Sequence, residues 1–103
     1  MLSKNSIATK TAEILINIEA VKFNIDEPFK LTSGKKSPVY CDCRKIISFP
    51  NERKILIKFA VEILKSQKFF KNIDVIAGGE TAGIPFASFI SSKLDLSMVY
   101  IRK

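Results

Sequence analysis

The 103-residue sequence has no histidine, only two cysteines and no long apolar run. Without histidine, the chain cannot form a Ser-His or Cys-His nucleophilic system of its own. Cys41 and Cys43 alone cannot close a four-ligand zinc site, and two residues so close on one strand are poorly placed for a disulfide. We therefore expect two reduced thiols, no metal ligands in the chain, and a reducing compartment.

The apolar stretches are all shorter than the roughly 18 residues that a membrane span needs, and the first residues lack the apolar block of a signal peptide. We therefore expect a cytoplasmic protein without a membrane partner. A composition of 47% hydrophobic and 26% charged residues is typical of one small folded domain.

Acidic residues are relatively few. The chain has 10 of them and 17 basic residues, which gives a net charge of +7. Such a balance can attract nucleic acid, an anionic membrane surface or a phosphorylated small molecule. The lysines are spread along the chain, however, and local basic clusters, such as Lys35-Lys36 and Arg102-Lys103, are short. No basic helix or aromatic-basic platform accompanies them, so we do not expect nucleic acid as the partner.

Helical spacing of apolar residues predicts an amphipathic helix from Ser3 to about Lys22 and a second from Ser48–Pro50 to about Lys68. Turn residues between them separate strand-like pieces. We interpret these pieces as a hairpin that pairs about 29–32 with about 38–43, in which Asp42 and Arg44 lie on one strand face and can form an ion pair.

The segment DVIAGGETAGIPFA at 74–87 predicts a buried strand at 74–77, a glycine turn, and a helix from about Gly83 to Leu94. The strand-like MVYIRK at 98–103 completes a βαβ unit with parallel strands. In such a turn Gly78, Gly79 and Gly83 can adopt positive φ, so that backbone N–H groups at the helix start can meet a phosphate or carboxylate. The alternative is a plain connection whose glycines serve only close packing.

Three segments, in this order and spacing, resemble orotate phosphoribosyltransferase: FKLTSGKKSPVYCDCR at 29–44, GGETAGIPFA at 78–87 and MVYIRK at 98–103. The resemblance covers nearly the whole chain and implies the amino-terminal half of that enzyme. The implied fold is α/β. An N-terminal helix and β-hairpin hood (1–47) are followed by the first βαβ part of a parallel, type I phosphoribosyltransferase sheet (48–103), and together they form one incomplete domain (1–103).

The implied reaction joins orotate to 5-phosphoribosyl 1-diphosphate and yields orotidine 5′-monophosphate and pyrophosphate with Mg²⁺, a step of pyrimidine (UMP) synthesis. The resemblance assigns diphosphate binding to Gly79, Glu80, Thr81, Arg102 and Lys103. It assigns contacts with orotate to Thr32, Tyr40 and Cys41. Lys103, at the start of the family's mobile loop, is the one candidate for a catalytic role.

Three positions depart from common family members, which carry lysine where this chain has Thr32 and, in some, Thr81, and often an aromatic residue in place of Cys41. The family's phosphoribosyl-binding signature, an acidic pair followed by a Thr/Ser-Gly-rich loop, has no counterpart in the 103 residues. We therefore expect a truncated chain with little or no activity alone. A homodimer, or a separately encoded carboxy-terminal half, is the expected partner. The alternatives are a non-catalytic remnant and a basic nucleic-acid-binding or regulatory module on the same frame.

Overall fold

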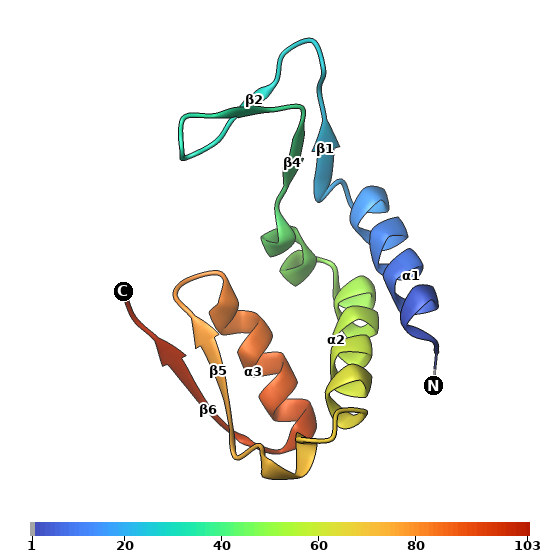
Figure 1. Ribbon diagram of the computed structural model, residues 1–103, viewed down its shortest axis with the longest axis vertical. Coiled ribbons are helices and arrows are strands. Elements are labelled where there is room, and N and C mark those ends of the chain that lie inside the picture. Colours follow the sequence, from blue (N-terminus) through green and yellow to red (C-terminus); the bar gives the residue numbers. More distant parts are fainter. Residues whose placement is uncertain (1) are drawn as a thin grey trace. The chain divides into compact units, whose positions relative to one another are not determined.

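A computed structural model describes residues 2–103, which form two compact units, residues 2–52 and 53–103 (Figure 1). The first unit runs from the helix α1 (Lys4–Asn17) to the 3₁₀ helix η1 (Cys43–Ser48). The second contains most of the helix α2 (Pro50–Lys65), followed by a βαβ unit.

Helix α1 is shorter than the sequence predicts. Its N-cap is Ser3, whose side chain accepts a hydrogen bond from the Ser6 N–H over 3.1 Å. At its end, Glu19 adopts φ of 60°, and its N–H and that of Ala20 donate to the carbonyls of Ile16 and Leu15. This is a Schellman motif with glutamate where glycine is usual, so no glycine in the sequence marks the stop near Asn17.

The hairpin that we predicted from 29–32 and 38–43 is wrong in its pairing. Strand β4 (Val39–Cys41) pairs antiparallel with β1 (Val21–Phe23), a segment that we assigned in part to the first helix. Strand β2 (Phe29–Lys30) pairs instead with β3 (Lys36–Ser37). The early stop of α1 releases Val21–Phe23 as an extended partner, and this pairing is continued by a hydrogen bond from the Asp42 N–H to the Ala20 carbonyl.

The turn between β2 and β3 contains Gly34, with φ of +88°. The Leu31 N–H donates to the Lys35 carbonyl over 2.8 Å, and the Gly34 N–H donates to the Leu31 carbonyl over 2.9 Å. The positive φ therefore favours glycine at position 34, although a Cβ there would meet no atom within 4 Å.

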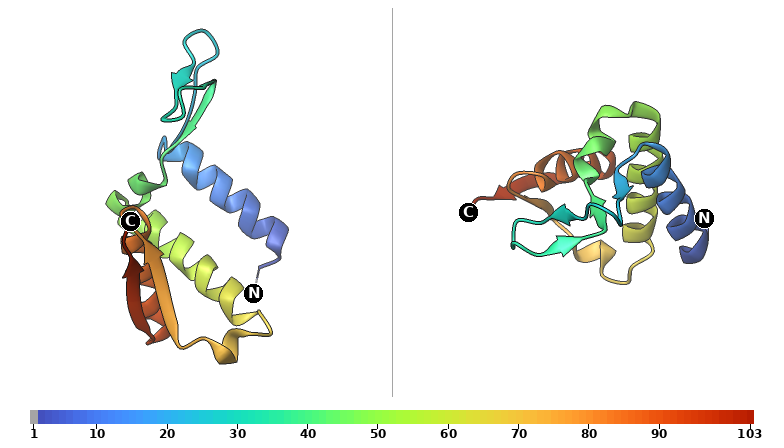
Figure 2. Two further views of the ribbon diagram at one scale, coloured as in Figure 1. Left: turned by 60° about the vertical axis from the view of Figure 1, so that its left-hand side comes forward. Right: turned by 90° about the horizontal axis from the view of Figure 1, so that it is seen from above.

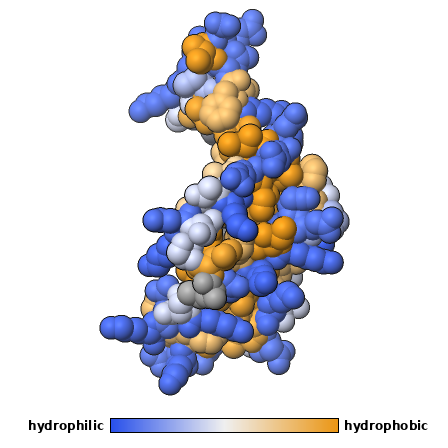
Figure 3. Space-filling model, turned by 90° about the vertical axis from the view of Figure 1, so that its right-hand side faces the viewer, coloured by the Kyte–Doolittle hydropathy of each residue, from blue (hydrophilic) through white to orange (hydrophobic). Residues whose placement is uncertain are grey.

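The core of the first unit is small, with Ile7, Ile18, Ala20 and Ile46 buried. Other apolar side chains of this unit reach the solvent, among them Phe23 and the 84% exposed Ile25. The space-filling view of Figure 3 shows such hydrophobic areas between hydrophilic ones. A core of this size contributes only limited stability to the unit.

Helix α2 begins at Pro50, as the sequence predicts, but ends at Lys65, before Lys68. The Ile63 carbonyl accepts hydrogen bonds from the hydroxyl of Ser66 and from the side-chain amide of Gln67. These side chains compete for a carbonyl that a further helical turn would need, which explains the earlier end. A short 3₁₀ helix, η2 (Phe70–Asn72), leads on to the next strand.

The second unit contains the predicted βαβ arrangement, with β5 (Val75–Gly79), α3 (Gly83–Leu94) and β6 (Ser97–Ile101). The two strands are parallel, in the register Val75↔Ser97 to Gly79↔Ile101. Figures 1 and 2 show the strands side by side with α3 against them. The prediction of helix 83–94 between two parallel strands is confirmed.

Gly78 is the point of closest approach between β5 and α3. A Cβ atom built on Gly78 would lie 2.6 Å from the Gly83 carbonyl oxygen and 2.8 Å from the Ala87 Cβ. The positive φ that glycine allows is not used at Gly78, Gly79 or Gly83, because Gly34 is the one glycine of the four with positive φ. Gly78 and Gly79 continue the strand, and Gly78 serves close packing rather than a turn.

The face of this sheet that does not carry α3 is apolar and open in the part of the chain that the structure describes. Every second side chain of a strand points to this face. Among them are Val75 on β5 and Val99 and Ile101 on β6, whose exposed fractions are 45%, 51% and 63%. Within residues 2–103, no helix is long and apolar enough to cross a membrane.

A methyl group added at Gly78 should destabilise the second unit. Because the Cβ of Gly78→Ala would collide with backbone of α3, we expect a loss of about 1–3 kcal/mol in the free energy of unfolding, measured by urea denaturation of the full chain. Gly79→Ala is the matched control, because a Cβ there meets no atom within 4 Å. Equal effects of the two changes would contradict the packing role of Gly78.

Candidate functional site

The carboxyl ends of β5 and β6 bring five of the predicted residues to one edge of the parallel pair. Gly79 ends β5, Glu80 and Thr81 follow it, and Arg102 and Lys103 follow β6. Because Gly79 pairs with Ile101, the residues after the two strands are neighbours. In open α/β sheets this edge is the usual place for ligands.

Glu80 connects the two strand ends. Its N–H donates to the Ile101 carbonyl over 2.9 Å, and its Oε2 accepts a hydrogen bond from the Lys103 N–H over 2.8 Å. The carboxylate is thus engaged with the backbone beside Arg102, and the segment after β6 is held against the turn. The sequence analysis did not predict these Glu80 hydrogen bonds, although the parallel register alone predicts that the residue after Gly79 lies beside the end of β6.

The turn after Glu80 leads into the N-terminus of α3. The Glu80–Thr81 peptide bond is cis, and the Thr81 carbonyl accepts from the Ile84 N–H over 3.2 Å. Ala82 is the N-cap and supplies no side-chain hydrogen bond, so no cap side chain occupies the first N–H groups of the helix. The partial positive charge of that helix end and the nearby Arg102 and Lys103 favour an anion at this edge.

The three residues predicted to contact orotate belong to the first unit. Thr32 is exposed in the turn between β2 and β3, and Tyr40 and Cys41 are adjacent on β4. The rings of Tyr40 and Phe29 contact each other, with centroids 5.7 Å apart and planes at 42°. Since successive side chains of a strand point to opposite faces, Tyr40 and Cys41 lie on opposite faces of β4.

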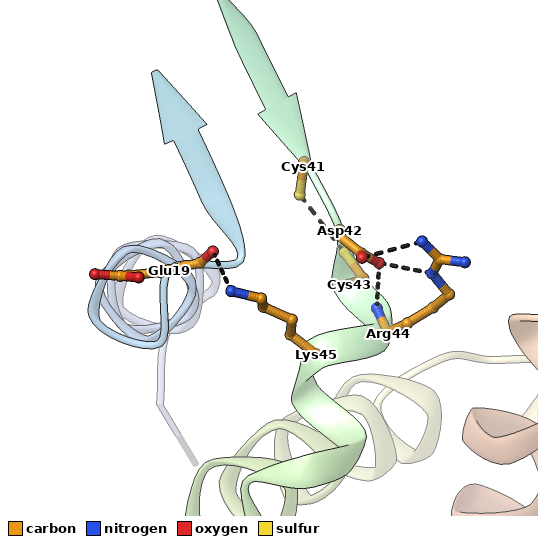
Figure 4. Close-up of polar contacts among 6 residues, drawn as sticks. All are labelled: Glu19, Cys41, Asp42, Cys43, Arg44 and Lys45. Atoms are coloured by element: carbon orange, nitrogen blue, oxygen red, sulfur yellow. Dashed lines mark hydrogen bonds and ion pairs between the residues drawn. The ribbon is translucent and has the colours of Figure 1, made fainter. Parts of the chain in front are cut away.

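Asp42 and Arg44 form the ion pair that the sequence suggested, but at a helix start rather than along a strand. Arg44 donates from Nε to Oδ1 of Asp42 over 2.8 Å and from Nη2 to Oδ2 over 3.0 Å. Asp42 is also the N-cap of η1 and accepts from the Arg44 N–H over 3.1 Å (Figure 4). The hydrogen bond from the Arg44 side chain is the main reason why the pKa of Asp42 lies below its usual value, and Asp42 in turn raises the pKa of Arg44.

The two cysteines are free thiols, as expected, and their sulfur atoms are 3.7 Å apart. Burial is the main cause that raises the pKa of the Cys43 thiol, and the neighbouring Cys41 and Asp42 raise it further. Near them, Lys45 donates from Nζ to the Glu19 carbonyl over 3.2 Å and so ties η1 to the end of α1. Apart from the C-x-C spacing, nothing in the sequence predicts the close approach of the two sulfur atoms.

No family model matches the chain, but curated proteins do. It is 49% identical over 100 residues to the orotate phosphoribosyltransferase of Sinorhizobium medicae and 48% identical over 97 residues to that of Rhizobium rhizogenes. In sequence, the chain is similar to the amino-acid sequences of these orotate phosphoribosyltransferases. The alignments cover 97% and 94% of this chain but 43% and 42% of the relatives, so the chain spans less than half of their length.

The solved structures extend the similarity from the sequence to the fold. UMP synthase of Leishmania donovani (30% identity, TM-score 0.73) aligns with 90% of this chain and 19% of its own. Orotate phosphoribosyltransferase of Aeropyrum pernix (25% identity, TM-score 0.73) aligns with 89% of this chain and 52% of its own. Adenine phosphoribosyltransferase of Trypanosoma brucei shares the fold at 20% identity, with a TM-score of 0.61. The family resemblance and the α/β fold class inferred from the motifs are confirmed.

The first test of the site concerns Asp42. Because its lowered pKa depends chiefly on Arg44, we expect Arg44→Gln to raise the pKa of Asp42 toward the usual value of an aspartate, which NMR titration of the carboxyl carbon measures. In the wild type, the stabilisation from this pair is present above the pKa of an unfolded aspartate and is lost as the pH falls through the lowered value. Lys45→Gln is the control and should move this pKa less, since Lys45 is the smallest of the causes.

The second test concerns the link through Glu80. Removing the carboxylate in Glu80→Ala takes away the acceptor for the Lys103 N–H, so this amide should exchange with solvent about fivefold faster, which corresponds to a hydrogen bond of about 1 kcal/mol. Hydrogen exchange followed by NMR measures the rate. Glu27→Ala removes an exposed carboxylate of the first unit and should leave the rate unchanged; an unchanged rate in Glu80→Ala would contradict the link.

Proposed function

We propose that this chain is part of an orotate phosphoribosyltransferase, which transfers the phosphoribosyl group of 5-phosphoribosyl 1-diphosphate to orotate and releases pyrophosphate. The observation that carries the proposal is the 48–50% identity to curated enzymes of that name over 94–97% of the chain. The edge formed by the ends of β5 and β6 supports it, because the reaction needs cationic and N–H donors for a diphosphate.

In this proposal the edge of the second unit binds the diphosphate. Thr81 would donate from its hydroxyl, and the first N–H groups of α3 would meet the diphosphate oxygens. Arg102 would contact the leaving pyrophosphate, and Lys103 would be the first residue of the mobile loop. Glu80 would act as a positioning residue, through the Lys103 N–H that its carboxylate holds.

The first unit would provide the hood over orotate, with residues 1–47 as hood and 48–103 as the start of the core sheet. Thr32, Tyr40 and Cys41 are the proposed contacts. Because Tyr40 and Cys41 lie on opposite faces of β4, only one of the two side chains can face the orotate ring directly, and the Tyr40 ring, which already contacts Phe29, is the better platform.

Mg²⁺ fits this scheme as an ion that arrives with the phosphoribosyl diphosphate. Among residues 2–103 no three Asp, Glu, Cys or His side chains gather into a metal site. Mg²⁺ commonly keeps several waters and binds substrate phosphates rather than a protein cage, so the diphosphate oxygens would be its main ligands. Bound there, it would neutralise charge on the leaving pyrophosphate.

The complete enzyme would be a homodimer and would act in the cytoplasm.

A chimeric enzyme tests the proposal. Residues 2–103 replace the aligned segment of the Sinorhizobium medicae orotate phosphoribosyltransferase, and formation of orotidine 5′-monophosphate is measured with Mg²⁺ present. We expect the chimera to be active, whereas the 103-residue chain alone gives little or no product. A folded but inactive chimera would contradict the proposal.

A substitution of Arg102 in the chimera tests one proposed contact with the pyrophosphate. Loss of a cationic donor to the pyrophosphate in Arg102→Ala should lower kcat/KM of the chimera about 100-fold, the usual order for one donor to developing charge. Lys71→Ala is the matched control. It removes an exposed cation in η2, away from the ends of β5 and β6, and should leave kcat/KM within about twofold.

A further inference from the structure

A pocket of about 330 Å³ lies between α2 and α3 in the second unit. Each helix contributes three lining residues that are at most four positions apart, and residues three and four apart on a helix share a face. The lining residues are Arg53, Lys54 and Ile57 of α2, and Phe89, Ser92 and Lys93 of α3. The volume falls within the usual range of small-molecule sites, roughly 300–1,000 Å³.

The pocket is cationic. Arg53, Lys54 and Lys93 contribute three positive charges, and among residues 2–103 no acidic side chain lines it. The side chains of Lys54 and Lys93 form no hydrogen bond or ion pair with any part of the chain that the structure describes. Like charges that share a pocket repel one another, so an anion bound among them is attracted by all three. A phosphate group, with about two negative charges at neutral pH, suits them better than a single carboxylate.

The rest of the lining is mostly apolar. Ile57 is buried and the Phe89 ring is half-buried. The guanidinium carbon of Arg53 lies 4.9 Å from the centroid of that ring, in a cation–π contact. A group that binds phosphate through paired N–H donors therefore lies beside a flat apolar surface. This juxtaposition fits a ligand in which a phosphate is joined to an aromatic ring.

We propose that the pocket between α2 and α3 binds a nucleoside monophosphate. The three cations bind the phosphate, the base packs against Phe89 and Ile57, and the exposed Ser92 hydroxyl forms a hydrogen bond with the sugar. One nucleotide is favoured over a nucleic acid strand, because the cations gather at a single pocket with one aromatic ring instead of following a strand with several. The site is independent of the proposed transferase activity and uses none of its residues.

Titration of the isotope-labelled 103-residue chain with UMP, followed by NMR, tests the site. We expect saturable shifts of the amide signals at 53–57 and 89–93, with one nucleotide per chain. Uridine lacks the phosphate and inorganic phosphate lacks the base and sugar, so each should bind about tenfold more weakly or worse. Added salt should weaken the binding of UMP, because it screens the exposed charges.

Two exposed lysines of the pocket provide the variant. Lys54→Gln combined with Lys93→Gln should weaken UMP binding about tenfold or more and leave the circular dichroism spectrum unchanged. Lys65→Gln combined with Lys71→Gln is the matched control, because it removes the same charge from exposed residues that do not line the pocket. This control should retain the affinity of the wild type.

Four outcomes would overturn the proposal. Inorganic phosphate binds as tightly as UMP, the pocket variant retains wild-type affinity, or the control variant loses as much affinity as the pocket variant. In the fourth, a single-stranded oligonucleotide binds more tightly than UMP and shifts the same amide signals. Arg102→Ala separates this site from the ends of β5 and β6, because it should leave UMP binding within about twofold only if the nucleotide occupies the pocket.

Discussion

The contact of α3 with Gly78 is the constraint on which the second unit depends. Because Gly78 has no side chain, the backbone of α3 can pack directly against the backbone of β5. The chain then returns along β6, which lies parallel to β5 in a fixed register. That register sets Glu80 beside the end of β6, and the Glu80 hydrogen bonds in turn hold Arg102 and Lys103 at the edge. One missing side chain thus determines where the cationic groups of the candidate site lie.

The second unit could be predicted from sequence because its signals are local. The apolar residues at 74–77, the proline near the helix start and the apolar strand that follows predict the bounds of α3, and those of its parallel strands to within two residues. The role of the glycines could not be predicted in the same way. A glycine that provides close approach and one that provides positive φ look alike in sequence, and only the packed helix distinguishes Gly78 from Gly34.

The first unit was harder to predict because its pairing is not local. Glu19 adopts a left-handed conformation, which a glutamate in the sequence does not predict. The helix ends there, so Val21–Phe23 forms a strand instead of a further helical turn. For the candidate site, the motifs identified the residues and the register explains how five of them meet. The motifs could not predict that Glu80 engages backbone, or that two thiols approach within 3.7 Å, since both depend on side-chain placement.

The open apolar face of β5 and β6 has a consequence for how the chain behaves in solution. Val75, Val99 and Ile101 present a flat hydrophobic surface, and within the described residues neither strand has a second neighbour. Such surfaces and edges invite association with further strands, whereas the net charge of +7 makes copies of the chain repel one another. Colloidal stability therefore rests on electrostatic repulsion, and salt, which screens that repulsion, should shift the chain toward self-association.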